Sequence, residues 1–284
     1  MQRRPNLQRF GRGFRGGCQV IAGAVLAFTA AGALAADSAA KADRIMAMTL
    51  LDPAGRPVAD AAGLKPEAPA HFERWPKPLL LLLVLTDDAA EGSGPTTTVS
   101  QIEAAAQSVG VGIQSCVVRL DQPESGTDCL AKSPDMLLGA ITDARHVPAL
   151  WERARAVKYG DAKIRTAVLT RLRDMLVALK TGKTCQSSNL STGSALAATV
   201  LVNHVFDPTE RATCATVLAY RALGVAVAAP NESVAALGER LAAATPGDVR
   251  PDEALKYLYS EGLRPEMTVQ DFRSELATWL GAQP

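Results

Sequence analysis

A short run of leucines constrains the fold of this chain more than any other feature. Residues 79–86 read LLLLLVLT, and they lie between Pro78 and the acidic pair Asp87 and Asp88. An apolar run of this length is either a fully buried strand or a piece of buried helix, and periodicity alone does not separate the two. The choice depends on the segments that follow.

Those segments predict a parallel pair of strands. A polar loop over 87–98 leads to an amphipathic helical stretch (99–109) and then to a second β-prone run. A strand, a crossover helix and a second strand form a parallel unit, and parallel strands covered on both faces read as continuous apolar runs. We therefore predict an α/β fold with a small, mostly parallel sheet covered by several helices and a helix-rich C-terminal half. Its strands are expected near 44–51, 79–86, 112–120 and 225–229.

The first 35 residues have the pattern of an export signal. Five arginines and no acidic residue precede the apolar segment 20–34, and Ala33 and Ala35 supply the spacing that a signal peptidase accepts. We expect cleavage after Ala35 and a periplasmic or secreted chain of residues 36–284. The alternative is an uncleaved anchor, but a spanning helix needs about 20 residues. After cleavage we expect no transmembrane anchor.

The charge of the mature chain excludes one class of partner. The whole chain has 30 Lys and Arg against 29 Asp and Glu, and removal of the five leader arginines leaves a net charge of about −4. A mildly acidic, mixed surface gives no electrostatic footprint for nucleic acid. We therefore expect no nucleic-acid partner.

Four cysteines outside the leader predict two disulfides. An even number in an exported protein is typical of a disulfide framework, with three connectivities open. We predict the nearest-neighbour pairs Cys116–Cys129, which closes a loop rich in turn residues, and Cys185–Cys214, which ties an irregular segment to a helix. The alternative is a redox pair or a zinc site. Because no CxxC motif and no Cys/His spacing of the metal-site kind occurs, we expect no metal and no cofactor.

The rest of the mature chain predicts a helix-rich single domain over 36–284, with a sub-boundary near 133 as the alternative. Asp161 and Asp207 are placed as helix N-caps. The segment 61–78 is expected to cross the surface, held to the core by Phe72 and Trp75. Helices are expected over 135–145, 148–157, 161–181, 192–205, 208–223, 232–244, 251–260 and 268–280.

The loop 87–98 is the candidate site, because ligands of open parallel sheets collect at the carboxyl ends of strands. Asp87 and Asp88 are candidate catalytic acids or cation ligands. Thr96, Thr97 and Thr98 precede a helix N-terminus, where an anion is stabilised. The alternative interpretation is purely structural: adjacent acids in solvent and threonines that cap a helix.

No catalytic motif survives a check of its spacing. Segments that match elements of penicillin-interacting serine enzymes occur in the wrong order, and no G-x-S-x-G is present. We therefore predict an exported, non-enzymatic protein-binding protein of the cell envelope, such as an adaptor or inhibitor, with an envelope or secreted protein as its partner. The alternative is an envelope hydrolase or small-ligand-binding protein that uses the loop 87–98.

Overall fold

The structure, a computed structural model, describes residues 38–53, 55–76, 80–87, 94–205, 207–227, 233–243 and 248–283, with the backbone alone for 94–97. Contacts divide the chain into two compact units, Met1–Ala40 and Lys41–Pro284. Of the first unit only residues 38–40 are described, and they are helical. The expected leader, 1–35, lies outside the described residues. No helix in the described ranges is long and apolar enough to cross a membrane.

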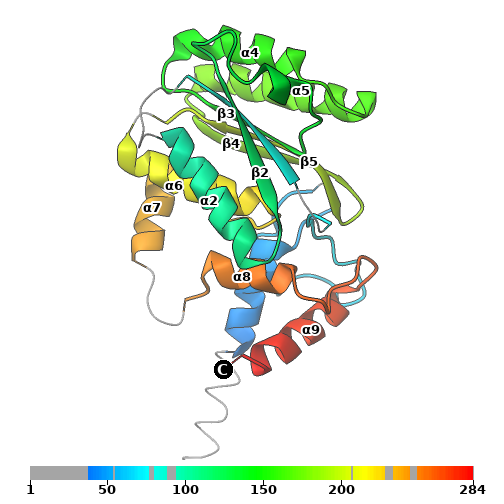
Figure 1. Cartoon of the computed structure of the whole chain (residues 1–284). Coiled ribbons are helices and arrows are strands. Elements are labelled where there is room, and N and C mark those ends of the chain that lie inside the picture. The colour runs from blue at the N-terminus through cyan, green and yellow to red at the C-terminus, as the bar shows by residue number, and fades with distance from the viewer. Residues whose placement is uncertain are drawn as a thin grey trace, which may run out of the picture. The chain divides into compact units, whose positions relative to one another are not determined.

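A five-stranded, mostly parallel sheet forms the centre of the second unit, which confirms the predicted α/β class (Figure 1). The strand order is β2-β1-β3-β5-β4, and only β4 runs antiparallel to its neighbour. The strands are β1 (Leu80–Thr86), β2 (Ile113–Arg119), β3 (Met136–Ala140), β4 (Cys185–Thr192) and β5 (Ala195–Asn203).

The leucine run is confirmed as a central strand. Strand β1 lies between β2 and β3 and is hydrogen-bonded to both. Because side chains alternate across a strand, Leu82 and Val84 enter the core on one face of the sheet, while Leu83 and Leu85 enter the core on the other. Both faces are covered, so the strand needs no polar residue.

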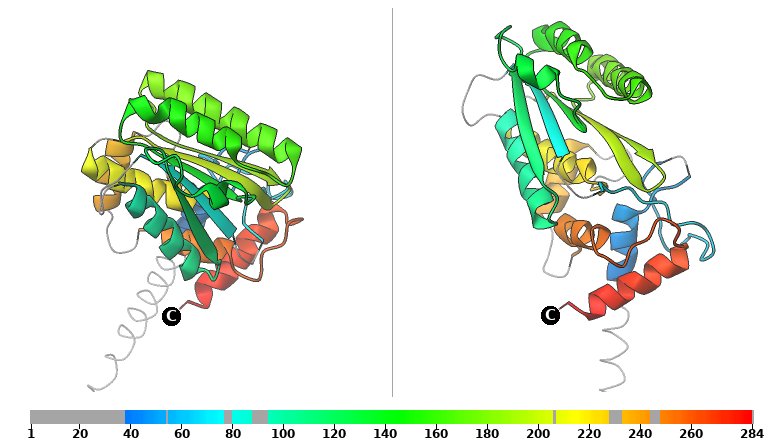
Figure 2. Two further views of the ribbon diagram at one scale, coloured as in Figure 1. Left: turned by 45° about the horizontal axis from the view of Figure 1, so that its top comes forward. Right: turned by 45° about the vertical axis from the view of Figure 1, so that its right-hand side comes forward.

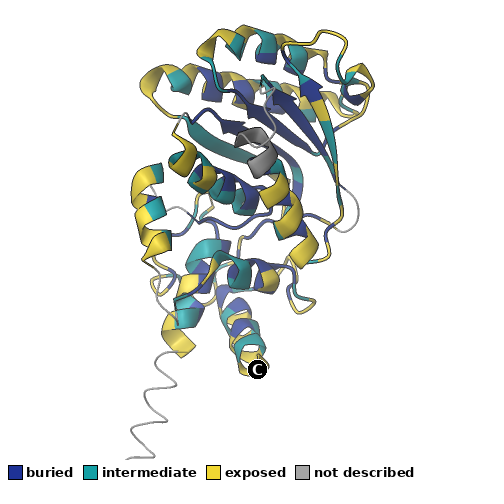
Figure 3. Cartoon of the chain, turned by 60° about the vertical axis from the view of Figure 1, so that its left-hand side comes forward, coloured by how far each residue is buried: buried dark blue, intermediate teal, exposed yellow. Residues whose placement is uncertain are grey.

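Helices cover both faces of the sheet (Figures 1 and 2). Helices α4 and α5 pack on one face, and α2 and α6 pack on the other, with exposed residues turned outward (Figure 3). Among the described residues, the named helices are α2 (Gly94–Ser108), α3 (Thr127–Leu130), α4 (Val147–Ala156), α5 (Ala162–Ala178), α6 (Pro208–Ala222), α7 (Val234–Ala242), α8 (Pro251–Leu258) and α9 (Val269–Gly281), with 3-10 turns η1 (Ala144–His146) and η2 (Leu179–Thr181).

The predicted helix caps are confirmed. The Asp161 carboxylate accepts hydrogen bonds from the backbone N–H groups of Lys163 and Ile164 at the start of α5. Asp207 does the same for Thr209 and Glu210 at the start of α6. These side chains satisfy donors that the first turn of a helix leaves unpaired.

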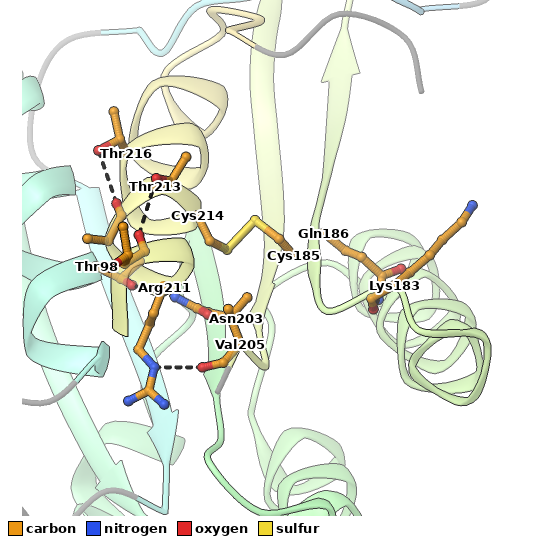
Figure 4. Close-up of a disulfide and its surroundings, with 12 residues drawn as sticks. Thr98, Lys183, Cys185, Gln186, Asn203, Val205, Arg211, Thr213, Cys214 and Thr216 are labelled. Atoms are coloured by element: carbon orange, nitrogen blue, oxygen red, sulfur yellow. Dashed lines mark hydrogen bonds between the residues drawn. A yellow bond between two sulfur atoms is a disulfide. The ribbon is translucent and has the colours of Figure 1, made fainter. Parts of the chain in front are cut away.

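The two predicted disulfides are confirmed. Cys116 of β2 is bonded to Cys129 of α3, and Cys185 of β4 is bonded to Cys214 of α6 (Figure 4). In each bridge the Cα atoms lie 5.8 Å apart. The expected packing of Phe72 and Trp75 is also found, since both side chains are buried.

The expected strand near 44–51 is wrong, because residues 38–49 are helical. The buried side chains Ala42, Ile45, Met46 and Thr49 recur at three- and four-residue spacing, which is the period of a helix. Leu51, which follows, makes only isolated bridges, to Pro57 and to His71.

Two expected helices are strands instead. The segment 135–145 contains β3, and the segment 192–205 contains β5. Both strands are covered on both faces, so neither shows the alternation that distinguishes a strand from a helix. In β3 the absent side chain of Gly139 makes room for α4, since a Cβ there would lie 2.7 Å from Leu150 Cδ1.

The expected strand near 225–229 is also wrong over its described residues, 225–227, while 228 and 229 lie outside them. This apolar run is buried, but its backbone does not join the sheet. The N–H of Val225 donates to Tyr220 O (2.9 Å) and the N–H of Ala226 donates to Met48 O (2.8 Å). The run therefore packs against helices rather than beside a strand.

Candidate functional site

Asp87, the first candidate from the sequence, links the carboxyl ends of two neighbouring strands. It follows β1, and its carboxylate accepts hydrogen bonds from the backbone N–H groups of Thr142 (2.8 Å) and Asp143 (3.0 Å), which follow β3. The Thr142 hydroxyl also donates to it (3.2 Å). The Asp87 carboxylate therefore holds the end of β1 to the end of β3.

Thr98 is likewise engaged in structure. Its side chain is buried, and its Oγ1 accepts a hydrogen bond from Asn203 Nδ2 (3.0 Å), which joins α2 to the end of β5. Asp88 lies outside the described residues, and the side chains of Thr96 and Thr97 are not described. Residues 94–98, which were expected in the loop before the helix, belong to α2 instead. A catalytic or ligand-binding site over residues 87–98 therefore stays a prediction.

Asp143, next to this contact, has a carboxyl group whose pKa is lowered. The Arg145 guanidinium and the Arg145 backbone N–H both donate to it, and they lower its pKa to about 2. The Asp143 side chain caps η1, the turn that directly precedes α4. The carboxyl ends of β1 and β3 are thus fixed by carboxylates that accept backbone hydrogen bonds.

A polar cavity of about 510 Å³ lies along β4, the edge strand at the other end of the strand order from β2. Residues 187–191 of β4 line it, together with His71 and Glu73 from the segment before β1. Arg171 enters from α5 and Arg221 from α6. Because these helices cover opposite faces of the sheet, the cavity extends around the sheet edge.

Asn189 organises one wall of this cavity. Its Nδ2 donates to Glu73 Oε2 and to the backbone O of Arg221, each at 3.1 Å. Its Oδ1 accepts from Thr199 Oγ1 of β5 (3.0 Å). One side chain therefore fixes a buried carboxylate, the end of α6 and the neighbouring strand.

Arg221 is the exceptional residue of the cavity. Its Nη1 is buried and has no hydrogen-bond partner. Burial lowers the pKa of Arg221, and the charge of the nearby Glu73 carboxylate opposes that shift. A buried N–H donor on a cation without an acceptor is costly, and native proteins leave few such groups unpaired.

The backbone of β4 presents unpaired groups along the same cavity. The N–H of Thr199 donates to Asp135 O on the β3 side (2.9 Å), so the even-numbered residues of β5 face β4. Their register partners in β4 include Gln186 and Ser188. The backbone N–H and C=O groups of Ser187 and Asn189 therefore point away from the sheet, and within the described ranges they have no further hydrogen-bond partner.

A second cavity, of about 530 Å³, is mainly apolar and lies between residues 44–48 and the start of α8. The arginines at its rim are already engaged. Arg44 pairs with Asp248 (2.8 Å), Arg250 pairs with Asp252 (3.1 Å), and Arg240 donates to a backbone carbonyl. The polar cavity, which is lined by an arginine with one buried donor that has no hydrogen-bond partner, is therefore the stronger candidate site.

The sequence interpretation missed the residues of this site. Glu73, Asn189 and Arg221 lie in three distant segments, and no motif connects them. The one available signal was the position of Glu73 between Phe72 and Trp75, two residues that were expected to be buried. A carboxylate held between two buried aromatic residues needs a polar partner.

No family model matches the chain, and no curated protein and no solved structure matches it. Across the described residues, no group of three His, Cys, Asp or Glu side chains is placed to hold a metal ion. The function has to be inferred from the geometry of the polar cavity and the sheet edge beside it.

Proposed function

We propose that the protein is an exported, non-enzymatic protein-binding protein of the cell envelope, such as an adaptor or inhibitor. A partner protein docks an extended segment onto the edge of β4. The leader pattern of residues 1–35 and the two disulfides support export to the periplasm or out of the cell, because disulfides persist in oxidising compartments.

The observation that carries this proposal is the row of outward backbone groups on the edge strand β4, which have no hydrogen-bond partner among the described residues. Proteins normally protect an exposed edge strand with charges, proline, a bulge or a covering segment. Strand β4 has eight residues, CQSSNLST, without a charge or a proline, and its one irregularity lies near its end, between Leu190 and Ser191. Ser187 and Asn189 offer two N–H donors and two C=O acceptors to a new strand. Addition of a strand to such an edge is a common mode of peptide recognition.

The apolar surface favours this mode over docking through a broad hydrophobic patch. Among the described residues, the large hydrophobic side chains that are clearly exposed are Val117 (46 %) and Val177 (59 %), which lie on β2 and α5. Two isolated valines on different elements do not form a docking patch. We therefore expect main-chain hydrogen bonds at β4, rather than apolar contacts, to hold the partner.

Replacement of Ser187 by proline tests the proposal. Ser187→Pro removes an N–H that points away from β5, so the ladder to β5 is kept while the docking edge loses a donor. Ser187→Ala is the matched control, since it keeps the N–H. We expect the purified protein, immobilised, to capture a partner from an envelope extract as wild type and as Ser187→Ala, and to lose it as Ser187→Pro.

Thermal melts of the three proteins establish that each is folded before capture is compared. A partner that binds folded Ser187→Pro as well as wild type would show that β4 is not the docking edge. Failure to recover any partner, combined with a melting temperature that only small molecules raise, would contradict a protein-binding function.

A further inference from the structure

Positive charge is concentrated in the layer of helices α4 and α5. This basic layer, residues 147–183, contains nine Lys and Arg against three Asp and Glu. The remainder of residues 36–284 contains 16 Lys and Arg against 26 Asp and Glu. A chain whose overall charge is mildly negative after residue 35 therefore carries a strongly basic layer on one face of its sheet (Figure 2).

Most of this positive charge is exposed and is not neutralised by nearby carboxylates. The ion pairs within the layer are Arg155–Glu152 (3.3 Å) and Arg173–Asp174 (3.7 Å). Five further basic side chains are exposed and form no side-chain hydrogen bond or ion pair with any described residue. These unpaired cations are Lys158, Lys163, Arg171, Lys180 and Lys183. The Lys183 side chain, for example, extends away from the other labelled residues (Figure 4).

The acidic residues elsewhere in the chain do little to offset this charge for a partner that meets the basic layer. At physiological salt the Debye length is about 8 Å, so only charges near the contact act strongly. The acidic residues of α8 and α9 lie on the other side of the sheet, because both helices join the core that includes α2 and α6. An approaching anionic surface is therefore attracted mainly by the basic layer.

We propose that the basic layer docks on a membrane surface that contains anionic phospholipids. The negative potential of such a surface attracts clustered lysines and arginines, and each one that comes near it adds to the affinity. The contact uses a different surface from β4. It relies on the proposed function for export alone, since an exported protein of the cell envelope meets a phospholipid surface.

The composition of the layer favours a lipid surface over an acidic protein. Interfaces between proteins are poor in lysine and depend on buried aromatic or aliphatic anchors. Four of the five unpaired cations are lysines. Among the described side chains of the layer, the large hydrophobic one that is clearly exposed is Val177. Lysines on long, flexible stems suit a fluid anionic surface, which requires charge rather than a fixed geometry.

Cosedimentation with lipid vesicles tests the proposal. The protein used is residues 36–284, because the unit Lys41–Pro284 is compact and contains both hydrophobic cores and both disulfides. The leader arginines, which would themselves bind an anionic surface, are thereby removed. We expect binding to vesicles that mix phosphatidylglycerol with phosphatidylcholine, none to phosphatidylcholine alone, and loss of the binding when salt is added.

A triple variant shows whether the basic layer makes the contact. It removes three of the unpaired cations: Lys163→Gln, Lys180→Gln and Lys183→Gln. Each basic side chain near an anionic surface contributes about fivefold in affinity, so the partition coefficient should fall by at least about tenfold. Because all three side chains are exposed and unpaired among the described residues, the melting temperature should stay close to that of wild type.

The matched control removes the same charge outside the layer. It combines three substitutions at exposed positions: Lys65→Gln, Lys256→Gln and Arg264→Gln. This variant should bind the mixed vesicles as wild type does. Equal losses in the two triple variants would mean that net charge, and not the basic layer, is responsible, and the proposal would be wrong.

The remaining outcomes are also decisive. Wild-type protein that ignores the mixed vesicles, or binds both kinds of vesicle alike, would overturn the proposal. Fluorescein-labelled polyglutamate is titrated in parallel. If polyglutamate binds through the three lysines while the vesicles do not, the partner of the layer is an acidic protein and not a membrane. Ser187→Pro should bind vesicles as wild type does, so a failure here and a failure of docking at β4 are distinguishable.

Discussion

Gly224 determines how closely the segment that carries Glu73 can approach α6. The residue has a φ of +95°, a conformation that side chains disfavour, and a Cβ there would lie 1.9 Å from Glu73 O. The glycine ends α6 and at the same time gives the Glu73 backbone its place. The position of Glu73 in the wall of the polar cavity therefore requires a residue without a Cβ at position 224.

We predict that Gly224→Ala lowers the free energy of unfolding by at least about 2 kcal/mol, since it adds both a strained φ and a clash with backbone. Gly182→Ala is the matched control. Gly182 has a φ of +82° but nothing within 4 Å of the added Cβ, so only the conformational cost of about 1 kcal/mol applies. Urea denaturation of the three proteins measures both values, and equal losses in the two variants would contradict the clash.

At the scale of elements, strand β1 connects the two halves of the core. Its even-numbered side chains Leu82 and Val84 pack towards α2 and α6, and Leu83 and Leu85 pack towards α4 and α5. In register, Leu82 lies level with Ser115 of β2 and Met136 of β3. Among the described elements, only β1 and its neighbour β3 are paired with parallel strands on both edges and also contribute buried side chains to both cores.

Leu82→Asp should unfold the protein or reduce its stability by more than about 4 kcal/mol, because it places an unpaired charge at a fully buried position. Val117→Asp is the control on the same sheet, since that side chain is 46 % exposed on β2. We expect the control to change stability by no more than about 0.5 kcal/mol. Guanidinium melts followed by far-UV circular dichroism compare them, and a wild-type midpoint for Leu82→Asp would show that the strand is not central.

The sequence predicts an element well when residues that interrupt regular structure mark both of its ends. The leucine run and the run after it are bounded by proline, glycine and acidic residues, and both are strands as expected. Strands β3 and β5 are also covered on both faces, but they are rich in Met, Leu and Ala, which favour helices in isolation. Sheet neighbours far away in sequence, which no local pattern reveals, decide their conformation.

The candidate site could not be predicted for a related reason. Asn189 was expected in an irregular segment, so the edge of β4 was not expected, and neither were its outward backbone groups. Arg221 was expected in a helix, which is correct, but its environment is built by a loop and a strand from elsewhere. A site formed at a sheet edge becomes visible only when the strand order is known.

At the scale of the whole molecule, one disulfide fastens each side of the sheet. Cys129 belongs to the core under α4 and α5, and Cys214 belongs to the core that includes α2 and α6. Cys116 and Cys185, their partners, lie on the strands β2 and β4 at the two ends of the strand order. Each bridge therefore ties an edge strand to a helix, which is α3 for Cys116–Cys129 and α6 for Cys185–Cys214.

The longer bridge should contribute more stability. The sequence separations of 13 and 29 residues correspond to about 3 and about 3.5 kcal/mol of loop-closure entropy. Cys214 is also fully buried, so its replacement by alanine adds a packing loss. Urea midpoints under oxidising conditions should therefore fall further for the Cys185→Ala, Cys214→Ala pair than for the Cys116→Ala, Cys129→Ala pair, and the reverse order would contradict the estimate.

Both bridges join cysteines that are consecutive along the chain after residue 35. A chain that is oxidised while it emerges with its N-terminus first would offer Cys129 as the first partner for Cys116, before Cys185 and Cys214 arrive. Native pairing is then the outcome of the order of synthesis, and no isomerase has to exchange one bond for another.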